Sequence, residues 1–189
     1  AFERYPQSPM LYFYPDLPYV QFVDSSQFAW RAQFESAFPA MRQEALALLG
    51  DAQDFRPYVT TNSDRPQGDV HGLLNNTDWS TYFLFENGAA VSDHVARCPV
   101  IFETVMRYVP LCNIGPRAPS VMLSLLRPHA KIPSHTGMIN CRYICHLPLV
   151  VPPDCGFRVG LERREWCEGG LMVFDDTVEH EAWNDSGQN

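Results

Sequence analysis

The sequence predicts a mainly β fold with flanking helices in a single domain. From Ser120 onward, short apolar runs alternate with Pro, Gly and Asp turns, as in VMLSLLRP, CRYICHLPLVV, GFRVGL and GLMVFDD. Short strands spaced this evenly are typical of a sandwich or a barrel, in which the sheets close on themselves and hide their edges. The chain has 189 residues, of which 46% are hydrophobic and 19% are charged. This length and composition fit one globular domain with a single core.

The first part of the chain is predicted to supply an arm, two helices and a loop. Residues 12–26 (YFYPDLPYVQFVDSS) are aromatic and broken by proline, which indicates an extended arm packed against the domain. Between Ser26 and Gly50 apolar residues recur at helical spacing, with Ser26 as N-cap, Gly50 as C-cap and Pro39 splitting the segment into two helices. Residues 51–76 are polar and rich in Asp, Asn, Thr and Pro, which predicts a long surface loop.

A strand and a further helix follow this loop. Residues 79–88 (WSTYFLFENG) predict a strand that ends in an Asn-Gly turn. Residues 91–110 favour a helix that begins at Ser92 or Asp93 as its cap. Its predicted apolar face consists of Val100, Phe102, Val105 and Met106. Within the single domain 1–189, residues 1–116 therefore form the arm, helices and first strands, and residues 117–189 form the β core.

Composition limits the classes of partner. The formal net charge is −8 and the sequence pI about 5.1, so nonspecific binding to nucleic acid or to anionic lipid has little electrostatic support. No apolar run approaches the roughly 18 to 20 residues that span a bilayer, and the first ten residues lack the apolar region of a signal peptide. We expect no nucleic-acid partner, no integral membrane segment and a cytoplasmic location. The six cysteines contain no CxxC pair, and most are expected as buried thiols.

Two histidines stand where predicted strands meet turns. His135 follows the turn-rich RPHAKIPS, and His180 follows FDDTVE, 45 residues later. Two neutral imidazoles at the ends of neighbouring strands can bind a divalent first-row metal, although a histidine in a turn is more often a solvated side chain. Non-haem iron oxygenases add a carboxylate, commonly two residues after the first histidine, and here that position is Gly137. Either water or a neighbouring carboxylate then supplies the third bond, the candidates being Asp175, Asp176 and Glu179.

Four motifs lie close together in residues 117–189. They are HTGMINCR, HLPLVVP, WCEG and FDDTVEHE, and the segment VMLSLLRPHAKIPS leads into the first of them. Together they resemble the aspartyl/asparaginyl β-hydroxylase family, whose motifs run HTGxxNxR, HLxLxxP, WxEG and FDDSxEHE. The resemblance implies a double-stranded β-helix, the jelly roll or cupin-like fold. It also implies Fe(II) bound by two histidines, with glycine in place of the usual carboxylate, and 2-oxoglutarate and O2 as cosubstrates.

Carried over by position, the resemblance assigns roles to five residues. His135 and His180 become the metal ligands and the catalytic pair. Ser124 falls on the serine that helps to hold the 2-oxoglutarate carboxylate, and His146 on a strand histidine that reaches the same cosubstrate. Arg142 is retained and can bind an anionic group. The implied reaction is hydroxylation of an unactivated carbon with release of succinate and CO2.

The sequence departs from the family in two places. The family strand often has a second, carboxylate-binding arginine two residues after Arg142, where this chain has Ile144; Arg158 is a second candidate for an anionic group. The arginine that pairs with the far carboxylate of 2-oxoglutarate would fall just past Asn189, so we expect the natural chain to continue and to contain it. The substrate remains open between a peptide or protein side chain and a lipid acyl chain or small molecule. A non-catalytic, cupin-like metal-binding module is the alternative of a different class, and the sequence does not indicate the oligomeric state.

Overall fold

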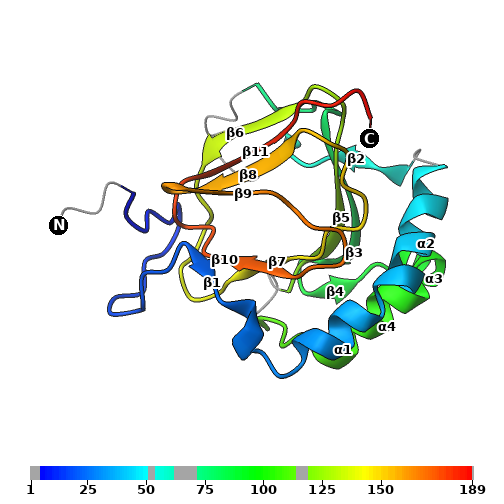
Figure 1. Ribbon diagram of the computed structural model, residues 1–189, viewed down its shortest axis with the longest axis horizontal. Helices are drawn as coiled ribbons and strands as arrows, with labels where there is room; N and C mark the ends of the chain where they lie inside the picture. Colours follow the sequence, from blue (N-terminus) through cyan, green and yellow to red (C-terminus); the bar gives the residue numbers. More distant parts are fainter. Residues whose placement is uncertain (1–4, 51–53, 62–71, 114–118, 189) are drawn as a thin grey trace.

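Three antiparallel sheets and a group of helices make up the protein. The computed structural model describes residues 5–50, 54–61, 72–113 and 119–188. Within these ranges the sheets surround the middle of the molecule, and the helices pack outside one of them (Figure 1). The predicted mainly β fold with flanking helices is therefore confirmed at that level.

The strands come from distant parts of the chain. The first sheet has the order β6 (Lys131–His135), β11 (His180–Asn184), β8 (Cys155–Val159) and β9 (Glu162–Arg164). The second has the order β1 (Phe22–Val23), β10 (Met172–Phe174) and β7 (Ile144–His146). In the third, β3 (Trp79–Glu86) pairs with β2 (Arg56–Pro57), β4 (Ala89–Ala90) and β5 (Val121–Leu126). The short strand β2 lies within residues 51–76, so this segment is not loop throughout, and residues 51–53 and 62–71 of it lie outside the described part.

The third sheet starts from the predicted strand and turn. Asn87 and Gly88 both have positive φ, 52° and 75°, and join β3 to β4. Asparagine and glycine tolerate this backbone region, which is why Asn-Gly favours a tight hairpin. The prediction of a strand that ends in this turn is confirmed.

The four α helices are α1 (Arg31–Ser36), α2 (Phe38–Leu49), α3 (Ser92–Arg97) and α4 (Pro99–Tyr108). Pro39 separates α1 from α2 as predicted, and Gly50 is the C-cap of α2. The prediction of a single helix over residues 91–110 is wrong, because the chain leaves the helical conformation at Cys98, which has φ −134° and ψ 52°. Pro99 lacks a backbone N–H and disfavours a helical conformation at the residue before it.

The predicted N-caps and part of the apolar face were also wrong. Ser26 lies inside a 3-10 turn, η1 (Ser25–Gln27), and donates its backbone N–H to the Asp24 carboxylate. Helices α1 and α3 begin after Trp30 and Val91, neither of which makes a side-chain cap bond. On α4 the buried residues are Ile101 and Thr104, whereas Met106 is 46% exposed.

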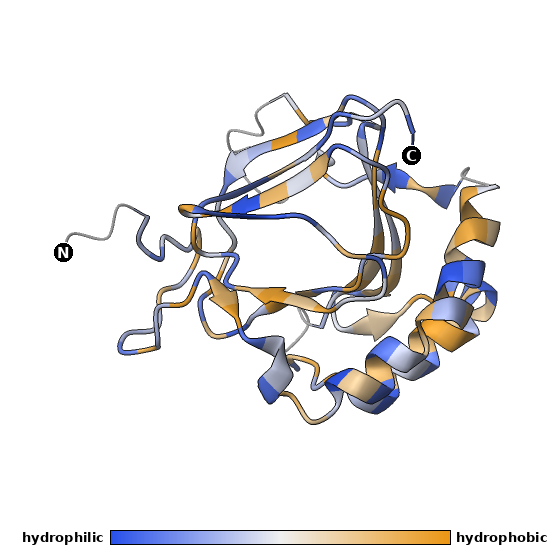
Figure 2. Cartoon of the chain, in the orientation of Figure 1, coloured by the Kyte–Doolittle hydropathy of each residue, from blue (hydrophilic) through white to orange (hydrophobic). Residues whose placement is uncertain are grey.

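Two buried clusters stabilise the fold, in place of the single core predicted. Strand β10 separates them, because Val173 faces the helices while Met172 and Phe174 face the interior between the sheets. Figure 2 shows this strand and its neighbours β1 and β7 as mainly hydrophobic, and all three residues of β10 are buried, as expected for a strand that is covered on both faces. The helix-side cluster also contains Met41, Leu48, Tyr82, Leu84 and Ile101. The cluster between the sheets also contains Ile132, Phe157, Val159 and Val178.

Two expectations from composition can be compared with the structure. The six cysteines are free thiols, but only Cys98 is buried, so the expectation of mostly buried thiols is wrong. Cys141, Cys145 and Cys167 are exposed, and Cys112 and Cys155 are partly buried. Among the described residues, no helix is long and apolar enough to cross a membrane.

Candidate functional site

The two predicted histidines lie side by side. His135 is the last residue of β6, His180 is the first of β11, and the two are register partners in this antiparallel pair. Partners in a ladder project from the same face of the sheet, and the two ring centroids are 4.1 Å apart. Strands separated by 45 residues of sequence therefore bring both imidazoles to one end of the first sheet.

The same local geometry fixes the tautomer of each ring. The Nδ1 atom of His135 lies 2.8 Å from the carbonyl oxygen of Pro133, and Nδ1 of His180 lies 3.0 Å from that of Val178. A carbonyl oxygen can only accept, so each Nδ1 carries the proton and donates it. In the neutral form, each ring then has an unprotonated Nε2, the arrangement that histidine ligands of metals usually adopt.

The protein interior keeps His180 neutral. Its side chain is buried, and burial together with the neighbouring His135 lowers its pKa to about 3. A protonated imidazole would lack solvation here and would repel a second cation. At neutral pH His180 is therefore in the form that can donate its Nε2 lone pair.

Gly137, two residues after His135, has no room for a side chain. A Cβ atom built there would lie 2.0 Å from Oδ2 of Asp176, and the Gly137 N–H donates to the Asp176 carbonyl over 2.6 Å. The Asp176 carboxylate thus occupies the space that a side chain at position 137 would take. Arg142 holds this carboxylate in an ion pair of 3.1 Å, while burial raises the pKa of Asp176 and the arginine opposes that rise.

Strands β3 and β5 supply hydroxyl groups beside the histidines. Ser124 and Thr81 are register partners on these strands, so their side chains share one face of the sheet. The indole Nε1 of Trp79 donates to Oγ of Ser124 over 3.0 Å, and the Trp79 ring lies 6.0 Å from that of His135. Tyr58 packs on Trp79 at 4.1 Å. Ser124 is thereby connected to the histidine pair through one indole ring.

Three buried polar atoms of the residues discussed above have no hydrogen-bond partner within the described part of the chain. They are Oγ1 of Thr81, Nε of Arg142 and Oδ1 of Asp176. Tyr58 is 39% exposed overall, but desolvation of its hydroxyl raises the pKa of that group, and the charges of Arg142 and Asp176 also act on it. Buried polar atoms are normally satisfied, and an unpaired one is an indication of a polar ligand or an ordered water.

His146 lies in an aromatic pocket within the same interior. Its ring centroid is 4.8 Å from Phe174, 5.5 Å from Phe157 and 6.2 Å from Trp166. Burial lowers the pKa of His146 to about 4, so the ring is neutral at physiological pH. A neutral ring among aromatic walls can offer one hydrogen bond without adding charge.

Arg158 does not join the site. Its guanidinium donates to the carboxylates of Glu179 and Glu181 and to the Ser134 hydroxyl, so its charge is already matched. It is the register partner of Glu181, which alternates with His180 along β11 and points to the opposite face. The expectation of Arg158 as an anion receptor is therefore wrong.

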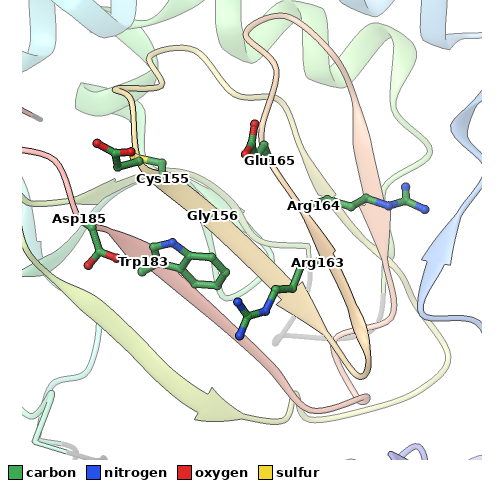
Figure 3. Close-up of a pocket in the computed structure, with 8 residues that line it drawn as sticks. Cys155, Gly156, Arg163, Arg164, Glu165, Trp183 and Asp185 are labelled. Atoms are coloured by element: carbon green, nitrogen blue, oxygen red, sulfur yellow. The ribbon is translucent and has the colours of Figure 1, made fainter.

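The same outer face carries a separate hollow of about 410 Å³. Figure 3 shows it beside Trp183, with Arg163 reaching over the indole ring at 5.6 Å. Gly156 makes room for that ring, since a Cβ there would lie 2.2 Å from it. Trp183 alternates with the buried Ala182 and lies on the face away from His180, so this hollow is not part of the candidate site.

The two adjacent aspartates differ in role. Asp175 is fully buried and accepts the N–H and hydroxyl of Thr177, which closes the turn before β11, and it also accepts from Gln7 of the arm. Asp175 is thus a turn residue, and Asp176 alone reaches the Gly137 side of the site. Sequence reasoning missed Trp79, Thr81 and Tyr58; the one available signal was the alternation that puts Trp79 and Thr81 on the same face of the predicted strand.

The residues present fit a metal held by two protein ligands together with a small polar ligand. Within the described ranges, no group of three or more His, Cys, Asp and Glu residues is gathered to hold a metal ion. The donor set is therefore the two Nε2 atoms, and Asp176 lies next to them with one oxygen unpaired. Oxygen ligands from water or from a chelating acid would have to complete the coordination.

Comparison with known proteins shows which family the chain resembles. A family model described as aspartyl/asparaginyl beta-hydroxylase matches residues 35–189. The chain is 29% identical over 164 residues to an ornithine lipid ester-linked acyl 2-hydroxylase of Rhizobium tropici, covering 85% of this chain and 54% of the relative. It is 28% identical over 170 residues to human aspartyl/asparaginyl beta-hydroxylase, covering 89% of this chain and 20% of that protein. It is also 28% identical to aspartate beta-hydroxylase domain-containing protein 2 of Xenopus tropicalis, over 95% of this chain and 46% of the relative. The chain thus spans about half the length, or less, of these curated relatives.

Proposed function

Because the chain belongs to the aspartyl/asparaginyl β-hydroxylase family, we propose that it is an Fe(II)- and 2-oxoglutarate-dependent dioxygenase that hydroxylates an unactivated carbon. The reaction would release succinate and CO2, and the three sheets would form the double-stranded β-helix of such enzymes. The observation that carries the proposal is the matched pair of imidazoles, 4.1 Å apart, each with its Nδ1 proton donated to a carbonyl two residues earlier. Two such rings suit a divalent first-row metal.

In this proposal His135 and His180 bind Fe(II), and the protein adds no carboxylate ligand. When bound, Fe(II) with 2-oxoglutarate supplies the activation of O2 that the side chains themselves cannot perform. The Asp176 carboxylate lies against Gly137, and its unpaired oxygen would be able to accept a hydrogen bond from a water bound there. Arg142 keeps that carboxylate charged and in position against the cost of its burial.

Ser124 and His146 are proposed to hold 2-oxoglutarate. The Ser124 oxygen already accepts from the Trp79 indole, so its own proton is directed elsewhere and is available to a carboxylate. Thr81, on the adjacent strand, offers a second buried hydroxyl without a partner. His146 is neutral and donates one hydrogen bond from the aromatic side. The aromatic rings around His146 lower the local polarity there, which strengthens a polar contact made by that ring.

The described residues favour an acyl chain or another weakly charged substrate over an aspartyl side chain. Arg142 is paired with Asp176, Arg158 is paired with two glutamates, and Ile144 stands where the family often has an arginine. The relative from Rhizobium tropici is named as an acyl hydroxylase. We therefore propose a lipid acyl chain as the substrate, with a peptide side chain as the alternative substrate. A non-catalytic metal-binding module is the alternative function of a different class.

An anaerobic titration tests the proposal. Fe(II) and then 2-oxoglutarate are added to the wild-type chain, and a visible charge-transfer band of the iron chelate is expected. The variants His135→Ala and His180→Ala should lose the band, whereas His129→Asn, which removes an exposed histidine elsewhere and suits its positive φ of 60°, should keep it. If Fe(II) binds but 2-oxoglutarate produces no band, the non-catalytic module is the better reading. Oxygen-dependent succinate release with pools of lipids, peptides and amino acids would then identify the substrate class.

A further inference from the structure

A run of exposed apolar side chains lies on the N-terminal arm. Met10 is 67% exposed and Leu11 58%, and Tyr12, Phe13 and Tyr14 are each more than half exposed. None of these five residues is charged. Single exposed apolar residues are ordinary, but a contiguous set is unusual on a soluble surface and marks a contact site.

Backbone hydrogen bonds hold the arm in place, so its exposed apolar side chains form a surface with a fixed position on the protein. Met10 donates its N–H to the Gly137 carbonyl over 2.8 Å, and Leu11 donates to that of Met138 over 3.0 Å. Asn140 accepts from the N–H of Tyr14 and donates to its carbonyl. The polar groups of the arm backbone are therefore used internally, and its apolar side chains remain outside.

This apolar surface lies beside the candidate site. The segment that anchors it, residues 137–140, begins two residues after His135, and Gln7 forms a bridge with Val178, two residues before His180. The arm thus meets the protein at the end of the sheets where β6 ends and β11 begins (Figure 1). Met138 on the anchoring segment and Leu17 on the arm, 43% and 36% exposed, extend the same surface.

The chemistry of the side chains identifies the partner. Tyrosine and phenylalanine combined with methionine and leucine are the residues that enter the interface of a bilayer, with apolar bodies among the acyl chains and phenol groups at the headgroups. Residues 10–17 contain no lysine or arginine, and the chain carries a formal charge of −8. Attachment would therefore depend on apolar contact and would gain nothing from anionic lipid.

We propose that the apolar arm, Met10–Tyr14 with Leu17 and Met138, docks on the surface of a zwitterionic bilayer and brings the candidate site to acyl chains there. This inference rests on the proposed function in its acyl-chain form. The arm supplies the contact, and its anchoring segment lies two residues from His135, so the histidine pair is held near the docked surface.

Vesicle flotation measures the docking. The wild-type chain is mixed with phosphatidylcholine vesicles, and its partition coefficient is compared with that of Leu11→Ser/Phe13→Ser. The wild type should float, and the double variant should partition at least about tenfold less, because two large apolar groups no longer enter the interface. The matched control Met106→Ser/Leu161→Ser removes two side chains of 46% and 65% exposure elsewhere on the surface and should float like the wild type. Replacing part of the phosphatidylcholine with phosphatidylglycerol should not increase binding.

Three results would overturn the inference. The wild type could remain with the unbound protein, the arm variant could float as well as the wild type, or binding could follow anionic lipid content. The inference would also be overturned if light scattering showed a dimer that depends on the arm and no vesicle binding occurred. The apolar arm would then be the contact with a second copy of the chain. The iron and 2-oxoglutarate band should be unchanged in the arm variant. A band without vesicle binding therefore refutes only the docking surface, and vesicle binding without a band refutes only the proposed chemistry.

Discussion

Replacing Gly137 with alanine should destabilise the protein through one identified contact. The backbone at Gly137 is outside the left-handed region, so alanine is tolerated conformationally. Its Cβ would nevertheless lie 2.0 Å from Oδ2 and 2.2 Å from Cγ of Asp176, which is closer than atoms can approach. The Asp176 carboxylate must therefore move, and its ion pair with Arg142 must break or lengthen.

The magnitude follows from the burial of this pair. The Asp176 side chain is 9% exposed and that of Arg142 23%, so the separated charges would stay largely out of water. Breaking a buried pair costs about 3 to 5 kcal/mol, and partial exposure of the arginine reduces this to about 3 kcal/mol. For a domain of this size, that loss lowers Tm by about 6 to 12 °C.

Thermal unfolding of the metal-free protein measures the effect. Gly187→Ala is the matched control, since a Cβ there would meet nothing within 4 Å and the melting temperature should stay within about 2 °C of the wild type. In an Asp176→Ala background, Gly137→Ala should cost less than about 1 kcal/mol, because the obstacle is gone. If Gly137→Ala melts like Gly187→Ala, or if its cost is the same in both backgrounds, the steric argument is refuted.

Three further predictions concern other parts of the structure. Glu44 accepts hydrogen bonds from two backbone N–H groups at the start of α4, at 2.9 and 2.8 Å. Urea unfolding should therefore show a free energy of unfolding that is about 2 kcal/mol lower for Glu44→Ala, and about half of that loss for Glu44→Gln. His146 has a pKa of about 4 in the folded protein and an ordinary value near 6.5 when unfolded, so its contribution to stability is present above about pH 6.5 and falls by about 2 kcal/mol at pH 5. His180 adds a loss of its own, so urea titrations should show that His146→Leu loses about 2 kcal/mol less than the wild type between pH 7 and pH 5. Trp79→Phe removes the indole N–H that donates to Ser124. Calorimetry should then show 2-oxoglutarate binding that is weaker by roughly three- to tenfold, in a variant of similar stability. An unchanged affinity would contradict the proposed role of Ser124.

Much of the β architecture and the histidine pair could be predicted from the sequence, because both depend on local patterns. Strand alternation, the Asn-Gly turn and the position of Pro39 are set by neighbouring residues. The motifs around His135 and His180 indicated their shared environment, and the register of β6 with β11 supplies it. The break at Pro99 was also local, but apolar residues on both sides of it favoured one continuous helix.

The remaining features depend on contacts that sequence spacing does not encode. The Asp176 carboxylate fills the space at Gly137 because two turns, 39 residues apart, meet at the end of one sheet. Arg158 was a plausible anion receptor until its register with Glu181 put it on the outer face. The two apolar clusters follow from a short strand, β10, that is buried on both faces, and three residues are too few to show this in a hydrophobicity pattern.

The most direct test of the central claim is anomalous diffraction from crystals of the chain grown without oxygen and loaded with Fe(II). The account predicts one strong peak within coordination distance, about 2.0 to 2.2 Å, of Nε2 of both His135 and His180, with water or 2-oxoglutarate completing the coordination and Asp176 outside it. A peak elsewhere, or imidazole rings turned away from a shared ion, would contradict it.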